Sequence, residues 1–462
     1  MNQRKLFVAS CFALVATSMA FSIRTDIVPQ LKGDFGFTDT QMGSLMGPGV
    51  WGFAITIVLG GFLVDSLGMK RLLSLAFLGH LTGIALTIFS RNFTSLYYAT
   101  LIIGLANGLV EAVTNPLVAT IYPDSKTKHL NQLHAWWPGG LILGGLLGYA
   151  ITKGMGLDVI GISSAALSFG WKIKVGLILI PTLIYGYLIS GEKFPETERV
   201  ARGVSYGDMF KEAFRPLFLL FVVLMMMTAA TELGPDQWVG NLVQNLVGIQ
   251  GVLLLVYTAG IMFVLRQFFA GAIIKAISPL GMLTMAALLS TIGLFWLSSS
   301  TTATMVFAAA TIFGFGKTFF WPTMLGVVAE RFPKGGALLL AILGGAGMFS
   351  AGKLMVTAMG SVQDHYAVHV LSPELQPLVV SNGGLDEKKI AMINDPVVRS
   401  EIESAKHYSA MMTYKWVAVL PALLTLIFGI LFLYFRARGG YEAVRLTDKA
   451  PSMSPRGVPR PV

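Results

Sequence analysis

The sequence predicts an all-α membrane protein with twelve membrane-spanning helices, and three observations support this expectation. The 462 residues are 54% hydrophobic and only 13% charged, with a mean hydropathy of +0.68. A soluble chain carries roughly 25% charged residues. A spanning helix needs about 20 apolar residues, so twelve of them would occupy about half of this chain. The 51 glycines agree, because small residues let membrane helices approach closely.

The same counts exclude other classes of protein. The single cysteine, Cys11, rules out a disulfide framework and a multi-cysteine metal site. The chain has no H-E-x-x-H motif, no phosphate-cradling loop and no serine–histidine–aspartate grouping recognisable by spacing. A soluble enzyme, a secreted scaffold and a disordered protein are therefore excluded, and we expect no enzyme activity, no cofactor and no metal.

Apolar runs of spanning length divide the chain into six and six. They lie at 6–31, 41–64, 72–90, 94–121, 132–152, 172–190, 216–240, 251–274, 280–299, 303–328, 336–359 and 413–435. The first run continues past Ala20, which favours a span over a cleaved signal peptide. We predict the following units: an N-terminal bundle (1–190), a polar linker (191–214), a C-terminal bundle (215–435) with a hydrophilic outer segment (361–411), and a disordered tail (436–462).

The distribution of basic residues indicates the orientation. Lysines and arginines gather in alternate loops, whereas the loops at 241–250 and 298–303 hold none. Because cytoplasmic loops carry the basic excess, both termini are expected in the cytoplasm, and we expect a bacterial inner membrane. Lys172 and Lys174 are assigned to a short outer loop. The net charge of +10 is thus a signal of orientation, and no nucleic-acid partner is expected.

A charged turn follows the second span. It reads Gly61-Phe-Leu-Val-Asp65-Ser-Leu-Gly68-Met-Lys70-Arg71. Gly61 allows close helix contact, Gly68 turns the chain, and the two cations are placed to pair with carboxylates nearby. An ordinary charged turn is the alternative. The run resembles the G-x-x-x-D-x-x-G-x-K/R signature of the major facilitator superfamily, which implies two six-helix repeats, alternating access and a conformational gating role for Gly61, Asp65, Gly68, Lys70 and Arg71.

Polar residues inside the spans indicate a hydrophilic cavity. Asn107, Glu111 and Asn115 recur every four residues in the fourth span, so we expect them on one helical face. Pro116 follows and is expected to loosen the backbone there. The alternative is that these side chains hydrogen-bond neighbouring helices together. A carboxylate near the middle of a span, however, usually faces a cavity or a partner.

Four segments resemble the fucose–proton symporter branch of that superfamily. They are Asp26-Ile-Val-Pro29-Gln30, Glu111-Ala-Val-Thr-Asn115-Pro116, Leu130-Asn131-Gln-Leu-His134 and Phe320-Trp321-Pro322-Thr323. The resemblance implies that Asp26 and Glu111 serve cation coupling and sugar recognition. His134 replaces a glutamine that contacts sugar in that family, and Ile23 and Thr25 replace asparagines, so fucose itself is put in doubt while a sugar-sized polar ligand stays plausible.

We expect polar and aromatic side chains to bind the ligand, because sugars stack on rings and hydrogen-bond to polar groups. The candidates are Asn107, Glu111, Asn115, Asn131, His134, Trp136, Trp137, Glu232, Lys317 and Trp321. For the tryptophans the alternative is an interfacial belt. For Glu232, the wet outer mouth of its helix is an equal alternative. The sharpest hypothesis is that Asp26 carries the coupling proton while Glu111, with Asn115 and His134, hydrogen-bonds the ligand.

The sequence therefore predicts a secondary active transporter that imports a monosaccharide or a similar small polar solute by cation symport, with the proton favoured. A proton-driven exporter of drugs or metabolites and a sodium-coupled sugar transporter are the alternatives. The expected partners are the solute, the coupling cation and membrane lipid, and a monomer is expected.

Overall fold

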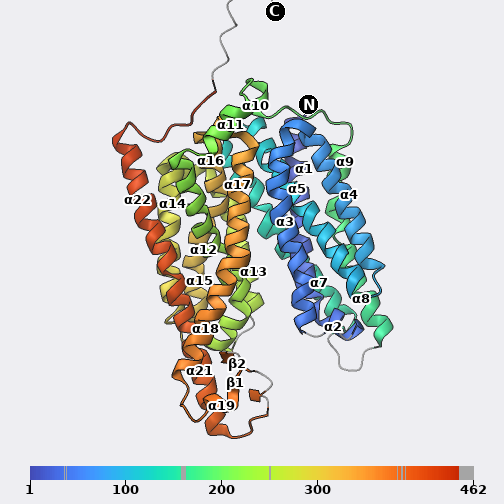
Figure 1. Ribbon diagram of the computed structural model, residues 1–462, viewed down its shortest axis with the longest axis vertical. Helices are drawn as coiled ribbons and strands as arrows, with labels where there is room; N and C mark the ends of the chain where they lie inside the picture. The colour runs from blue at the N-terminus through green and yellow to red at the C-terminus, as the bar shows by residue number, and fades with distance from the viewer. Residues whose placement is uncertain are drawn as a thin grey trace, which may run out of the picture.

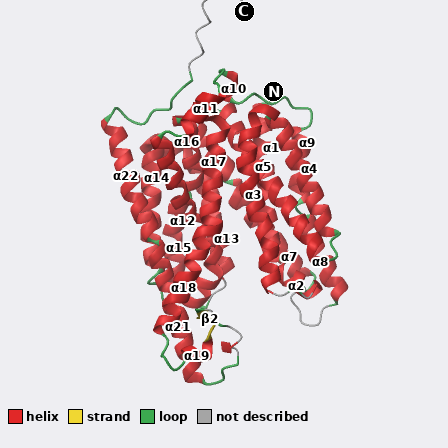
Figure 2. Ribbon diagram, viewed as in Figure 1, coloured by secondary structure: helices red, strands yellow, loops and turns green. Residues whose placement is uncertain are grey.

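The computed structural model describes residues 1–446 except positions 36, 38, 158–162, 249–250, 382, 387–388 and 391. Two helical bundles stand side by side (Figure 1), and helices make up almost all of the drawn ribbon (Figure 2). Helix α1 begins and helix α22 ends at the same end of the molecule. We call this end the terminus side and the opposite end the far side.

The first bundle is built from nine helical segments. They are α1 (Gln3–Asp26), α2 (Val28–Phe35), α3 (Asp39–Leu67), α4 (Met69–Ile88), α5 (Phe93–Ile121), α6 (Lys126–His134), α7 (Trp136–Gly154), α8 (Ser164–Gly176) and α9 (Leu179–Ile189). Two short helices then lie across the terminus side, α10 (Glu198–Ala201) and α11 (Tyr206–Ala213).

The second bundle contains the following helices and short helical turns. They are α12 (Pro216–Val247), α13 (Gly251–Val264), the π-helical turn η1 (Leu265–Phe269), α14 (Ala270–Leu297), α15 (Ala303–Lys317), α16 (Phe320–Arg331), the 3₁₀ turn η2 (Pro333–Gly335), α17 (Gly336–Phe349), the π-helical turn η3 (Ser350–Met355), α18 (Val356–Val370), α21 (Pro396–Val417) and α22 (Val419–Ala437).

The described helices make twelve crossings, as predicted. Ten stretches of the described residues are long and apolar enough to span a membrane. One of them, Leu253–Leu297, contains two crossings, because the backbone turns at Ser278 (φ 64°) before Pro279. The twelfth crossing is α7, with the sequence WWPGGLILGGLLGYAITKG. It is not one of the ten stretches because its glycines and tryptophans lower its mean hydropathy. The fold is thus an all-α membrane protein.

Two sequence predictions need correction: the start of the sixth crossing and the effect of Pro116 in the fourth. The sixth crossing begins near Ala165 rather than at 172, so Lys174 lies inside helix α8 and is fully buried instead of standing in an outer loop. Helix α5 continues through Pro116 to Ile121. Close packing on both sides of α5 holds this stretch helical, because Val113, Leu117 and Val118 are fully buried.

The predicted hydrophilic outer segment (361–411) is mostly helical. Helices α18 and α21 project past the bundle on the far side (Figure 1). Between them lie α19 (Gln376–Val379) and a two-stranded antiparallel pair, β1 (Val380–Ser381) with β2 (Gly384–Leu385), which the sequence did not predict. A small apolar core holds this projection together, consisting of Leu371, Val379, Ile402 and Ala405.

The tail predicted as disordered from residue 436 is ordered over its first part. Helix α22 ends at Ala437, and residues 438–446 return over the terminus side (Figure 1). The hydroxyl of Tyr441 donates to Glu330 (2.7 Å), and the backbone N–H of Val444 donates to the Glu330 carbonyl (2.8 Å). These two bonds fix the segment, while the prediction for positions 447–462 falls outside the described residues.

Glycines at four-residue spacing let α7 lie directly against α1. A Cβ atom at Gly140 would collide with Ser18 Oγ, one at Gly144 with Ser22 Oγ, and one at Gly148 would lie 2.7 Å from Asp26 Oδ2. Gly145 on the other face of α7 has open space. Small residues at this spacing are the usual means of close helix approach in membranes.

Gly140→Val is expected to lower the thermal unfolding midpoint of the purified protein, because overpacking a tight contact costs about 1–3 kcal/mol. Gly145→Val is the matched control, since it makes the same chemical change in the same helix without a neighbour. Equal midpoints for the two variants would contradict the packing described for α1 and α7.

Candidate functional site

A mainly apolar cavity with a few convergent polar groups lies between the two bundles. With its mouth it encloses about 350 Å³ and is lined by Phe53, Glu111, His134, Trp137, Glu232, Leu233, Arg266, Trp321 and Met348. Five of the predicted ligand-binding residues therefore face this cavity: Glu111, His134, Trp137, Glu232 and Trp321. Pockets that hold small ligands are typically concave and mostly apolar, with a few convergent polar groups, and this composition fits that description.

One wall of the cavity carries a chain of hydrogen bonds. The ring Nε2–H of His134 donates to Asn115 Oδ1 (2.9 Å), and Asn115 Nδ2 donates to Glu111 Oε2 (2.7 Å). The tautomer of His134 follows from the orientation of the amide. Glu111 is buried, and no lysine or arginine of the described residues lies within ion-pair distance of it.

The opposite wall is organised by Arg266, which stands on the π-helical turn η1. Its guanidinium donates to Glu232 Oε1 (2.7 Å), to the His134 carbonyl (3.0 Å) and to the Thr318 carbonyl (2.5 Å). Both carbonyls are available for one reason. The residue four positions later is Pro138 in one case and Pro322 in the other, and proline has no N–H to donate.

The break before Pro322 also places Trp321. Helix α15 ends at Lys317 and α16 begins at Phe320, so the backbone N–H of Trp321 donates to Glu232 Oε2 (3.2 Å). Both oxygens of this carboxylate are thus engaged, and Trp321 presents its ring to the cavity. Arg266 was not among the residues predicted from the sequence to bind the ligand, so its place in the cavity was missed. The signal that could have found it is in the sequence: Pro138 and Pro322 each leave the carbonyl four residues earlier without a helical donor, and a buried arginine can donate to both.

Lys317 does not line the cavity, although it was predicted to do so. Its ammonium donates to Asp236 Oδ1 (2.5 Å) and Oδ2 (2.7 Å) and lies 5.3 Å from the centre of the Phe313 ring. Asp236 belongs to the same bundle, so this pair does not join the two halves. A buried lysine is costly unless it is paired, and the carboxylate meets that need here.

Three further predicted contacts also point elsewhere. Asn107 Oδ1 accepts from His80 Nε2 (2.8 Å) inside the first bundle. Each step of four residues turns about 40° beyond one full helical turn. Asn107 is two such steps from Asn115, so its side chain points away from the cavity. Asn131 Nδ2 donates to Thr323 Oγ1 (3.3 Å) on the terminus side, away from the residues that line the cavity. Trp136 packs edge-on against Phe263, with ring centres 5.4 Å apart.

Asp26 lies at the far-side end of α1 and is not among the residues that line the cavity. Lys174 Nζ donates to its Oδ2 (2.5 Å) and to Thr152 Oγ1 (2.6 Å). Arg24 does not pair with Asp26 and instead lines a separate, mainly apolar cavity between α1, α3, α5 and α8. The cation that holds Asp26 is therefore Lys174, a residue the sequence reading had placed in a loop.

The motif after α3 connects the first bundle to the linker. Asp65 accepts from Arg199 Nε (2.7 Å) and from Thr197 Oγ1 (2.5 Å). Gly68 turns the chain with φ 84° and precedes α4, as predicted. Lys70 Nζ donates to the Glu192 carbonyl (2.8 Å), whereas Arg71 is exposed. The partner of Asp65 thus comes from the linker and not from the basic pair beside it.

The two bundles are joined on the terminus side. Thr127 donates to Glu330 Oε1 from its N–H (3.1 Å) and its hydroxyl (2.6 Å), and Lys126 Nζ donates to the Ala329 carbonyl (3.3 Å). Gly61 faces Ala341 of α17 so closely that a Cβ atom would collide with it. The ribbons of the two bundles separate toward the far side (Figure 1). The structure is therefore closed on the terminus side.

Twelve crossings in two bundles around a cavity with convergent polar groups, closed at one end, are the architecture of a multi-pass membrane transporter. The chain belongs to the Major Facilitator Superfamily, whose family model matches residues 6–352. It is accordingly a transporter and not an enzyme.

Several known proteins are similar to this chain. The minor myo-inositol transporter IolF of Bacillus subtilis is 26% identical over 258 residues, which is 50% of this chain and 56% of that protein. The chain thus spans about half the length of this curated relative. The structure of the E. coli fucose:proton symporter FucP matches with a TM-score of 0.65 at 16% identity over 90% of this chain and 98% of that one. The proton:xylose symporter XylE matches with a TM-score of 0.68 at 13% identity over 93% and 96%.

Arg266→Met is expected to destabilise the protein by about 3–5 kcal/mol, because it leaves the buried Glu232 carboxylate without its cation. The double variant Arg266→Met with Glu232→Gln removes that uncompensated charge and should recover part of the loss. The checking measurement is a double-mutant cycle of unfolding midpoints. Additive effects of the two changes would show that the pair is not coupled.

Asp65→Asn is expected to slow solute uptake, because it weakens the contact with Arg199 on the terminus side. The cavity is distant from this change, so equilibrium binding of the solute should stay within about threefold, where a tenfold change is about 1.4 kcal/mol. Uptake into vesicles and binding to the purified protein are measured side by side. A large loss of binding with unchanged uptake per bound solute would reverse this assignment.

Proposed function

We propose that this transporter imports a monosaccharide or a cyclic polyol together with a proton. The observation that carries the proposal is the chain of hydrogen bonds that joins His134, Asn115 and Glu111 at a cavity also lined by Trp137 and Trp321. Each wall of the cavity thus offers both polar groups and an aromatic ring, which suits a ligand with hydroxyls and an apolar ring face. The named substrates of IolF, FucP and XylE support this class of solute.

The cavity argues against export of hydrophobic compounds. Two carboxylates, an arginine and a histidine reach its surface: Glu111, Glu232, Arg266 and His134. An apolar drug would have to cover these groups without hydrogen-bonding to them, which costs free energy for each buried polar group. A hydroxylated solute can hydrogen-bond to them.

The geometry favours Glu111 over Asp26 as the carboxyl that gains and loses the coupling proton. Glu111 borders the cavity without a cationic partner, whereas Asp26 is held by Lys174 outside it. Solute binding and protonation at Glu111 would share one space, which gives a direct physical link between them. The alternative in which Asp26 carries the proton is tested separately below.

We also propose that the terminus side is cytoplasmic, as the basic loops predict. The terminus-side segments bear Lys5, Lys70, Arg71, Lys126, Arg199 and Lys334, which fits the excess expected of cytoplasmic loops. In this orientation the structure is closed toward the cytoplasm, and the cavity takes up solute from outside.

Glu111→Gln is expected to abolish accumulation of solute against its gradient, because the amide cannot exchange a proton. Counterflow exchange, which needs no net proton movement, should persist at a reduced affinity, since a charge-assisted hydrogen bond is worth about 1.5–3 kcal/mol. Labelled myo-inositol, xylose and fucose are tested in proteoliposomes with and without a protonophore. Accumulation that follows a sodium gradient and ignores the protonophore would identify sodium as the coupling ion.

Asp26→Asn distinguishes the two carboxyls. If Glu111 carries the proton, this variant should keep proton-driven accumulation and show a lower unfolding midpoint, because Lys174 loses its partner. The double change Asp26→Asn with Lys174→Met should restore part of the stability. Loss of accumulation in Asp26→Asn with intact counterflow would assign the proton to Asp26 instead.

A further inference from the structure

A second cavity lies on the terminus side, outside the space between the bundles. With its open mouth it encloses about 1300 Å³, compared with about 350 Å³ for the central cavity. The linker, the end of α16 and the ordered tail surround it. Its lining residues are Arg202, Gly203, Val204, Asp208, Glu212, Arg215, Leu217, Arg331, Phe332, Pro333, Lys334, Val444, Arg445 and Leu446.

The charge of this lining is unbalanced. Five basic side chains and two acidic ones reach the cavity. Both acids already have partners: Glu212 pairs with Arg215 (3.0 Å), and Asp208 accepts from Ser205 and Lys211 (2.9 and 3.4 Å). The Ser205 hydroxyl, followed by Lys211, holds the pKa of Asp208 below its ordinary value. Arg445 is in turn paired with Asp124 (2.7 Å), so the remaining excess of positive charge facing the cavity comes from the other basic side chains.

Arg331 presents a hydrogen-bond donor that has no acceptor. Its guanidinium lies 5.0 Å from the centre of the Phe435 ring, and its NH1 donates to the Glu442 carbonyl (2.7 Å). Its Nε is shielded from solvent and has no hydrogen-bond partner. Aromatic contact and the tail thus hold this arginine in place beside the cavity.

The neighbouring helix α11 exposes a row of aromatic side chains. Tyr206, Phe210 and Phe214 recur every four residues and are exposed, Phe214 to 75%. Asp208, Glu212 and Arg215, from the other side of the same segment, reach the cavity. Aromatic rings on one face and charges on the other are typical of a helix in the interfacial layer, which is where lipid headgroups lie.

We propose that this cavity, between the linker, the end of α16 and residues 441–446, binds a phosphate-bearing anion. The phosphate group matches the donors available, because guanidinium groups bind phosphate oxygens through paired N–H bonds and lysine adds a mobile charge. Two sources share this chemistry: the headgroup of an anionic phospholipid and a soluble phosphate. Basic clusters beside a spanning helix on the cytoplasmic side commonly bind anionic lipid. The inference does not depend on the transported solute.

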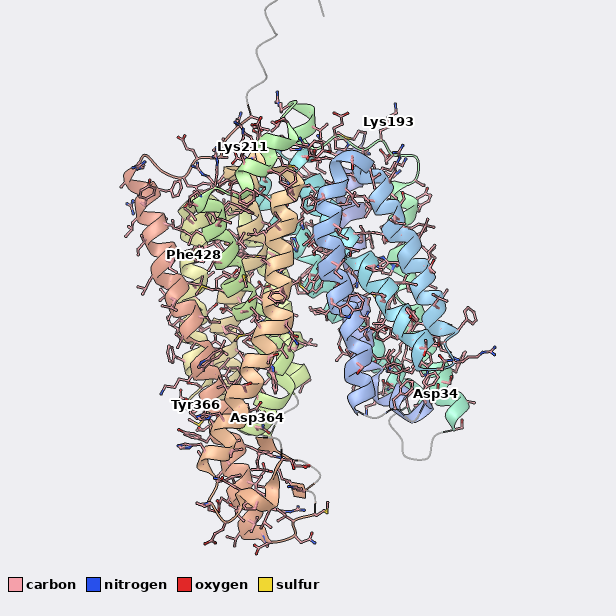
Figure 3. All side chains as sticks on the ribbon, viewed as in Figure 1. Asp34, Lys193, Lys211, Asp364, Tyr366 and Phe428 are labelled. Carbon is pink, nitrogen blue, oxygen red and sulfur yellow. The ribbon has the colours of Figure 1, made fainter. Side chains whose placement is uncertain are left out.

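The test uses the purified full-length protein in a neutral detergent. One arm adds phosphatidylglycerol, with phosphatidylcholine as the uncharged counterpart, and the other adds sodium phosphate against sodium chloride at equal ionic strength. Binding is followed by native mass spectrometry for the lipid and by the shift of the unfolding midpoint for both probes. The variant Arg215→Gln with Lys334→Gln removes two cations of the cavity. The matched control Lys193→Gln with Lys128→Gln removes two exposed cations outside the cavity, and Lys193 lies on the terminus side (Figure 3).

We expect the wild-type protein to bind phosphatidylglycerol or phosphate more tightly than its counterpart probe, with the affinity falling as salt is raised. The Arg215/Lys334 variant should lose at least about tenfold in affinity, which is about 1.4 kcal/mol, whereas the control should stay within about twofold. Binding of lipid alone identifies a headgroup as the source, and binding of phosphate alone identifies a soluble ligand. No binding of either probe, or equal binding by the two double variants, overturns the proposal.

Discussion

The arrangement of the central cavity depends on Arg266. Membrane helices must satisfy every backbone carbonyl within the protein, and the prolines at 138 and 322 leave two of them without their helical partners. One guanidinium donates to both carbonyls and to Glu232 at the same time. Because His134 belongs to one bundle and Thr318 to the other, the arginine also fixes the distance between the two halves.

A second set of contacts holds the terminus side closed. Glu330 receives Thr127 from the first bundle and Tyr441 from the tail, so one buried carboxylate joins three parts of the chain. The linker contributes Arg199, which reaches the motif aspartate Asp65. Opening this side therefore requires the tail, the linker and the α6–α16 contact to rearrange together. Such a shared transition fits a fold in which two rigid repeats move against each other.

Much of the fold could be predicted from the sequence, because apolar runs of about 20 residues have few alternatives in a membrane protein. The chemical types that line the cavity were also predictable, and Glu111, His134 and Trp321 lie there. The partners of charged residues were not. Lys174 was misplaced because its helix begins earlier than the apolar run suggests. Asn107 was misplaced because residues spaced four apart do not stay on one face of a helix over two steps. Pairings such as Asp65 with Arg199 join segments distant in sequence, which periodicity within one helix does not reveal.

The bonds of Arg266 also make the two conformational states chemically unequal. When the bundles separate on the terminus side, the arginine can keep Glu232 and the Thr318 carbonyl, which belong to its own bundle, but it must leave the His134 carbonyl. The His134 carbonyl is then left without a hydrogen-bond donor, because Pro138 has no N–H to donate to it. Water, or a hydroxyl of the solute proposed above, would take that place. The two sides of the membrane thus meet binding sites of different hydrogen-bonding capacity, which gives the carrier an intrinsic asymmetry of affinity between loading and release.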